Sequence, residues 1–147
     1  MKYIETLQET PVKLRFLMKE LVNKCTEQNE DVCCELGLNT AESNVLISFG
    51  TKDEMTSSEL AKMLSISNSR ITKIIDGLIE KELILREYGT EDRRVIHLRL
   101  TNKGKKTTKK LEKVFCKCYQ DIMQKMNKGE IKVVLESLEK LVSVMNN

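Results

Sequence analysis

Residues 56–100 decide the fold, and they run TSSELAKMLS ISNSRITKII DGLIEKELIL REYGTEDRRV IHLRL. The segment Thr56-Ser57-Ser58-Glu59 is a capping box, which begins a short helix. Ser65-Ile66-Ser67 is long enough only for a turn. A second helix follows, with apolar side chains at helical spacing: Ile71, Ile74, Ile75, Leu78 and Ile79. Two short helices joined by such a turn predict a helix-turn-helix.

The hydrophobic period changes from 3.6 to 2 directly after these helices. Residues 83–88 and 95–100 alternate as strands do, and the polar segment 89–94 between them is typical of a hairpin tip. A helix-turn-helix followed by a two-stranded hairpin is a winged helix. A further helix, from a capping box at Asn39 and Glu42 to Gly50, precedes it. We therefore expect residues 39–100 to form a winged helix-turn-helix.

Long amphipathic helices flank this unit. We expect the first to begin at Thr10-Pro11 and to end near residue 28, with residues 29–38 as a connection. Residues 51–55 are expected to be a linker. Thr101 begins a basic helix, and a capping box at Asn127 begins the last one.

The apolar stripes of residues 10–30 and 101–147 are longer than the small central unit needs. A second copy of the chain is their simplest partner, so we expect these segments to be dimerisation helices. The predicted fold class is mainly α with a small β-hairpin wing. Residues 1–147 are expected to form a single domain.

Composition limits the class of protein. The chain has 147 residues, of which 40% are hydrophobic and 32% charged, as is typical of one globular domain. No apolar run is long enough for a membrane span, and residues 1–20 lack the apolar core of a secretory signal. Five cysteines, an odd number without any sign of export, are expected to be reduced thiols in the cytoplasm.

The net charge of +3 hides a local excess of positive charge. Residues 62–113 contain 14 basic and 7 acidic side chains, a net charge of +7, whereas residues 1–61 contain 6 and 11. Such an excess is typical of a protein that binds a polyanion. A solvated helix face rich in lysine, between Lys103 and Lys113, is the alternative explanation.

The second helix of the helix-turn-helix has a polar face opposite its apolar stripe. Hydroxyl groups, the cation of Lys73 and the carboxylate of Asp76 suit base edges and phosphates in a major groove. The N–H groups at the start of the helix can bind phosphate. A solvated helix face is the alternative. The candidate DNA contacts on this helix are Ser67, Asn68, Ser69, Arg70, Thr72 and Lys73.

The hairpin tip holds Asp92, Arg93 and Arg94. Arginine has the shape to enter a narrow minor groove or to hold a phosphate. Asp92 can accept a hydrogen bond from a neighbouring arginine and keep it extended. A charged tip that only favours solubility is the alternative, but its place directly after a helix-turn-helix favours DNA binding.

Several segments carry a resemblance to a known family: Leu60-Ala61, Ser69–Lys73, Leu78–Lys81, Leu83–Arg86, Glu91–Arg94 and Leu98–Gly104. They resemble the MarR family, the dimeric winged-helix transcription regulators of bacteria and archaea. The resemblance covers residues 10–145 in element order. Its most specific motif is the Asp-Arg-Arg tip followed by a strand and Leu-Thr-x-x-Gly.

The resemblance implies a repressor that binds near-palindromic operators as a homodimer and is released by an effector. It places the DNA-recognition helix within residues 65–76 and the wing tip at Arg94 with Asp92. The first, fifth and sixth helices would build the dimer. One departure is Glu82, where the family usually has Gly before the first wing strand. A Glu there must adopt strained left-handed backbone or end the helix differently.

Nothing in the sequence predicts catalysis. His97 is the single histidine, on the expected solvent side of a strand, without the Ser or Cys arrangement of a catalytic triad. No enzyme activity, cofactor or metal site is expected, and one histidine argues against the zinc-sensing branch of the family. A winged helix that binds protein instead of DNA is the alternative function, although the net charge of residues 62–113 favours DNA.

Four cysteines form two close pairs, Cys33-Cys34 and Cys116-x-Cys118. In the implied fold both pairs can approach the cleft between the dimer helices and the DNA-binding part, where thiols bind a soft metal or are oxidised. Cys25 and Cys118 lie on apolar stripes, so packing as small hydrophobic side chains is the alternative. A small apolar or aromatic ligand is the competing effector.

Overall fold

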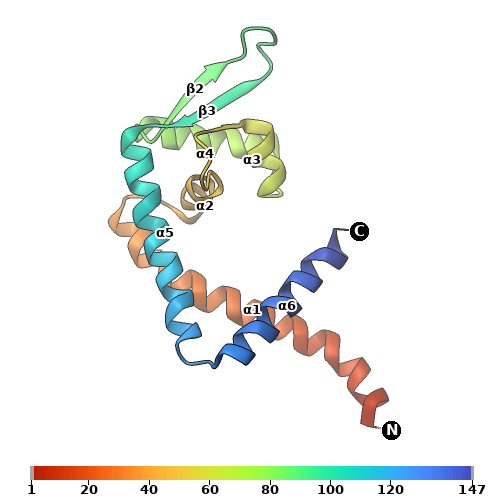
Figure 1. The fold of residues 1–147 in the computed structure, drawn as a ribbon. Coiled ribbons are helices and arrows are strands. Elements are labelled where there is room, and N and C mark those ends of the chain that lie inside the picture. Colours follow the sequence, from red (N-terminus) through yellow and green to blue (C-terminus); the bar gives the residue numbers. More distant parts are fainter. Residues whose placement is uncertain (1, 147) are drawn as a thin grey trace. The chain divides into compact units, whose positions relative to one another are not determined.

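The computed structural model describes the backbone of residues 2–146 and the side chains of this range except those of residues 2–9 and 28. Residues up to Val114 form one compact unit and those from Phe115 a second. The elements, labelled in Figure 1, are α1 (Lys2–Glu35), α2 (Thr40–Ser48), β1 (Glu54–Thr56), α3 (Ser57–Met63), α4 (Asn68–Glu80), β2 (Ile84–Tyr88), β3 (Ile96–Leu100), α5 (Asn102–Met123) and α6 (Lys128–Met145). The predicted fold class, helices with a small wing, is confirmed.

The core of the first unit lies where α2, α3 and α4 meet the sheet. Its fully buried side chains include Phe49, Met55, Leu60, Leu78 and Leu98. Burying each such side chain stabilises the fold by roughly 1.5–3 kcal/mol. The helix-turn-helix is thereby fixed to the base of the hairpin, which projects beyond it (Figure 1).

The capping boxes predicted at Asn39, Thr56 and Asn127 are all formed. In each, the side chain of the first residue accepts a hydrogen bond from the backbone of a glutamate three residues later. That glutamate's carboxylate accepts in return from the first residue's N–H. These short-range signals therefore position the starts of α2, α3 and α6.

The sheet has three strands in the order β1-β3-β2, not the two that the sequence predicts. β1 lies in the segment expected to be a linker and pairs antiparallel with β3, with Met55 opposite Leu98. Three residues are too few to show a period of two, so only the tertiary pairing reveals the strand.

The predicted bounds of the first helix are wrong. α1 begins at Lys2 and passes through Pro11, and it continues to Glu35 through the expected connection. The fixed φ of proline is compatible with helix, and its cost there is one lost N–H hydrogen bond and crowding of the preceding turn. Because the helix extends to Glu35, Cys33 and Cys34 lie in its last turns and not in a loop.

Glu82, where the family usually has Gly, lies just after α4 and has the strained backbone expected of a non-glycine residue there. Glu82 has a φ of +60°, in the left-handed region. Its carbonyl accepts a hydrogen bond from the Thr101 hydroxyl at 2.6 Å, which holds the turn from α4 to β2. Gly104 packs against this turn so closely that a Cβ there would lie 2.0 Å from the carbonyl oxygen of Leu83.

The second unit contains the end of α5 and all of α6. No side chain of α6 is buried, although the helix carries Val133, Val134, Leu135, Leu138 and Val142. Within the described part of the chain, no helix is long and apolar enough to cross a membrane.

Candidate nucleic-acid interface

The helix α4 buries one face and exposes the other. Ile71, Ile75 and Leu78 are buried against the core. Ser67, the N-cap residue, accepts a hydrogen bond through its hydroxyl from the Arg70 N–H at 3.3 Å. The core therefore holds the helix in place, and the Ser67 cap fixes its first turn.

All six candidate DNA contacts on this helix are exposed, from Ser67 to Lys73. The hydroxyl of Ser69 is within 3.2 Å of the Ser67 hydroxyl, and that of Thr72 donates to the Asn68 carbonyl at 2.8 Å. The side chains of Arg70 and Lys73 have no hydrogen-bond or ion-pair partner among the residues that the structure describes. Both cations are thus available to a ligand.

Asp76, further along the same face, is already paired. Its carboxylate accepts a hydrogen bond from Arg86 of β2 at 2.5 Å, and the Arg86 side chain is largely covered. The sequence places Asp76 on the polar face but gives no sign of this pair, because the two residues lie on different elements. The ion pair ties the recognition helix to the first strand of the wing.

The wing loop is fixed by its own hydrogen bonds. The Gly89 N–H donates to Val95 at 2.9 Å and the Val95 N–H to Asp92 at 3.1 Å. The Asp92 carboxylate accepts from the backbone N–H of Arg94 at 2.9 Å, not from an arginine side chain as expected. This geometry leaves the guanidinium groups of Arg93 and Arg94 exposed and without a partner in the described structure.

The outer face of the sheet carries an ion-pair cluster at Glu54, His97 and Arg99. The Glu54 carboxylate accepts hydrogen bonds from His97 Nδ1 and from Arg99, both at 2.7 Å. The Arg99 guanidinium, and then His97, lower the pKa of Glu54 below its ordinary value. His97 is therefore half-buried in a strand contact and not simply solvent-facing.

The four sensor-candidate cysteines divide between buried and exposed positions. Cys33 is buried and accepts a hydrogen bond from the Ser43 hydroxyl at 3.1 Å, and Cys118 is also buried. Cys34 and Cys116 are exposed. No group of three or more His, Cys, Asp or Glu side chains suited to a metal ion occurs among the described residues.

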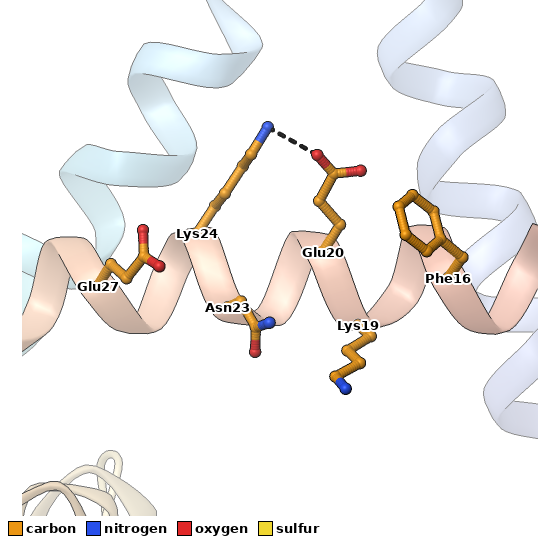
Figure 2. Close-up of a pocket in the computed structure, with 6 residues that line it drawn as sticks. All are labelled: Phe16, Lys19, Glu20, Asn23, Lys24 and Glu27. Carbon is orange, nitrogen blue, oxygen red and sulfur yellow. Dashed lines mark ion pairs between the residues drawn. The ribbon is translucent and has the colours of Figure 1, made fainter.

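A surface hollow of about 400 Å³ lies along α1 (Figure 2). Phe16 lies at one end, and the Lys24–Glu20 ion pair of 3.1 Å lies across its middle. Glu27 adds a second carboxylate at the other end. Its two lysines are balanced by two carboxylates, so this hollow is a poorer polyanion site than α4 and the wing.

Comparison with known proteins agrees with this geometry. Residues 38–96 match the model of the MarR family. The chain is 33% identical over 135 residues to the uncharacterized HTH-type transcriptional regulator YpoP of Bacillus subtilis strain 168, and the match covers 87% of each chain. This chain belongs to the MarR family. MarR-family proteins are winged-helix transcriptional regulators.

Two further matches extend the comparison. The chain is 30% identical over 100 residues to the HTH-type transcriptional repressor MdtR of B. subtilis, covering 68% of this chain and 62% of MdtR. The crystal structure of Streptococcus pneumoniae FabT in complex with DNA has a TM-score of 0.79. That match covers 93% of this chain and 97% of FabT at 22% identity, and it shows a shared fold.

Proposed function

We propose that this MarR-family chain is a homodimeric, sequence-specific DNA-binding repressor that acts in the cytoplasm on near-palindromic operators and is released by an effector. One observation carries the proposal. Arg70, Lys73, Arg93 and Arg94 are exposed on α4 and the wing and have no ion-pair partner in the described structure, whereas Arg86 and Arg99 are paired with carboxylates. FabT, which has the same fold, is described in complex with DNA.

The two parts of the interface contact DNA differently. The start of α4 enters the major groove, where its hydroxyls and Lys73 meet base edges and the N–H groups of Asn68 and Ser69 meet a phosphate. Arg94, at the tip of the wing, enters the adjacent minor groove or holds its phosphates. Asp92 orders the loop that presents it.

A second copy of the chain covers the apolar faces that this one exposes. On α1, Leu14, Phe16, Leu17 and Leu21 are between 43% and 64% exposed. On α6, no apolar side chain is buried. Two recognition helices related by a two-fold axis then meet half-sites about 34–36 Å apart. Light scattering at micromolar concentration is expected to give twice the 17.0 kDa chain mass, and a stable folded monomer contradicts the dimer.

The effector acts either on thiols or through a small organic ligand. Cys34 and Cys116 are exposed, and each lies within two residues of a buried cysteine. We propose that a soft metal or an oxidant at these pairs shifts the recognition helices and releases DNA. DNA binding is measured for wild type and for a variant with serine at Cys33, Cys34, Cys116 and Cys118, with and without Zn²⁺, Cu⁺ or peroxide. If wild type ignores all three, the cysteines only pack and the organic ligand is favoured.

A salt titration tests DNA binding itself. Phosphate contacts by several cations give a steep fall of log K with log salt, about 0.9 per contacted phosphate. The probe is a duplex of about 30 base pairs selected by the full chain from a randomised pool. If the chain selects no sequence from the pool and binds DNA only weakly and independently of salt, the alternative is favoured, a winged helix that binds protein.

A further inference from the structure

Tyr88, the last residue of β2, is exposed without an evident structural reason. Its side chain is 61% exposed, and its hydroxyl has no hydrogen-bond partner in the described part of the chain. Tyrosine exposed in this way is a frequent contact residue at binding surfaces, because the ring supplies apolar area and the hydroxyl a hydrogen bond.

The alternation of β2 places Tyr88 on the side of the wing that faces α4. Ile84 and Arg86 lie on the same face, since side chains two residues apart in a strand share a face. Ile84 is buried in the core, and Arg86 reaches Asp76 of α4. Tyr88 therefore lies on the same face of β2 as Arg86 and is closer to the wing tip than Arg86 is.

Tyr88 lines a surface hollow with Gly89, Thr90 and Arg93, with a volume of about 690 Å³. Gly89 permits this fold of the loop, because a Cβ there would lie 2.5 Å from the Asp92 carbonyl oxygen. The loop hydrogen bonds from Gly89 and Val95 hold it closed. Arg93 is therefore set beside Tyr88 by a fixed backbone.

The groups in this hollow suit an anion. Arg93 is a cation without an ion-pair partner among the described residues, and the hydroxyls of Tyr88 and Thr90 can both donate hydrogen bonds. The carboxylates of the tip, Glu91 and Asp92, line a second hollow with His97, which shares Gly89 and Thr90 with the first hollow but not Tyr88 or Arg93. An anionic ligand therefore meets donors at the first hollow and carboxylates at the second.

We propose that Tyr88 and Arg93 hold one sugar–phosphate unit of the DNA backbone beside the wing loop, separately from the contact of Arg94. The proposal rests on the DNA-binding function proposed above. The Tyr88 hydroxyl and the Arg93 guanidinium donate to a phosphate oxygen, and the Tyr88 ring lies against the deoxyribose. Such a contact fixes the register of the wing on the duplex without selecting a base.

The experiment compares Tyr88→Phe, Arg93→Ala and wild type, as full chains, on the duplex selected by wild type. Tyr88→Phe loses one hydrogen bond to a charged group, so binding is expected to weaken about tenfold with no change in salt slope. Arg93→Ala is expected to weaken binding to a similar extent and to lower the slope by about 1. The control Leu85→Ala changes an exposed side chain on the opposite face of β2 and is expected to bind as wild type.

Phosphate ethylation interference locates the contact on the same duplex. One ethylated phosphate in each half-site is expected to weaken wild type most and each variant less, because each variant keeps only one of the two donors to that phosphate. Wild-type affinity and an unchanged interference pattern in both variants, while Lys73→Ala weakens binding, overturn this inference alone. If wild type shows no salt-dependent binding to any duplex, the proposed function fails instead.

Discussion

The two ends of α4 carry similar residues in different environments. At the N-terminal end, Arg70 and Lys73 are exposed and have no partner in the described structure. At the C-terminal end, Lys81 donates to the Glu42 carboxylate at 2.6 Å and accepts, through its carbonyl, a hydrogen bond from Lys103 at 2.9 Å. The same helix thus has one end left open to a ligand and one end closed by internal contacts.

The difference shows how rigidity and binding are separated along one element. Glu42 is only 4% exposed and also accepts from the Asn39 N–H, so it joins the start of α2 to the end of α4. Thr101 and Gly104 join the same region to α5. Charges at the closed end act on stability, and charges at the open end are expected to act on affinity.

The largest effect is expected from Gly104→Ala at the closed end. The new Cβ would meet the Leu83 carbonyl oxygen at 2.0 Å, and backbone cannot move aside as a flexible side chain does. Such overpacking is expected to lower the free energy of unfolding by about 3 kcal/mol. Urea denaturation at fixed protein concentration measures it.

Gly129→Ala is the matched control, because a Cβ there meets only the Asn127 side chain at 3.3 Å. It is expected to be neutral or to stabilise by about 0.5–1 kcal/mol. Equal unfolding midpoints for Gly104→Ala and wild type would show that the junction is looser than its geometry indicates.

Lys81→Met removes the partner of a buried carboxylate. Glu42 keeps its hydrogen bond from Asn39 but loses the cation that pairs with it in the described structure, and the partial exposure of Lys81 limits the loss to about 1–2 kcal/mol of stability. The salt slope of DNA binding is expected to stay unchanged. Lys62→Met serves as the control, because Lys62 is exposed and has no ion pair in the described structure, and its stability is expected to be within about 0.5 kcal/mol of wild type. A reduced salt slope in Lys81→Met would place this lysine in the interface.

Arg94→Ala and Lys73→Ala are expected to show the opposite pattern. Each should cost about 1–3 kcal/mol of DNA-binding free energy and leave the unfolding midpoint unchanged, since both side chains are exposed. Lys73→Ala should also relax sequence preference, because Lys73 lies on the major-groove face. Fluorescence anisotropy at matched salt measures the affinity. Wild-type affinity in both variants contradicts the assignment.

Local signals explain why much of the architecture is predictable. The boxes at Asn39, Thr56 and Asn127 depend on residues three apart, and the stripe from Ile71 to Ile79 depends on helical spacing alone. The exposed candidate residues of α4 and the wing follow from the same pattern, since they lie opposite the stripe or at a hairpin tip. Their contacts with DNA remain a prediction.

Long-range contacts explain what the sequence does not show. β1 exists because Met55 lies opposite Leu98, and Asp76 is paired because Arg86 of the next strand reaches it. Glu42 and Lys81 are 39 residues apart, so the capping motif predicts the glutamate but not its burial. The extension of α1 beyond residue 28 is another example. The polar residues 29–31 interrupt the apolar stripe, and the burial of Cys33 after them is seen only in the folded structure.

The smallest effect is expected at the outer face of the sheet, where Glu54 contacts His97 and Arg99. Because the Arg99 guanidinium, and then His97, lower the pKa of Glu54, the folded state binds a proton there less readily than the unfolded chain. This stability is present above the ordinary glutamate value of 4.5 and is lost as the pH falls below it.

Glu54→Gln is therefore expected to lower stability slightly at pH 6, and the difference from wild type should shrink between pH 4.5 and pH 3. Urea denaturation at each pH measures the difference. The matched control is Glu87→Gln, because Glu87 lies opposite His97 on β2 but has no ion-pair partner among the described residues. The pKa values of Asp53 and Glu59 are also lowered, so the free energy of unfolding still depends on pH in every variant. A difference between wild type and Glu54→Gln that stays constant down to pH 3 would mean that the contact with Arg99 is too exposed to stabilise the fold.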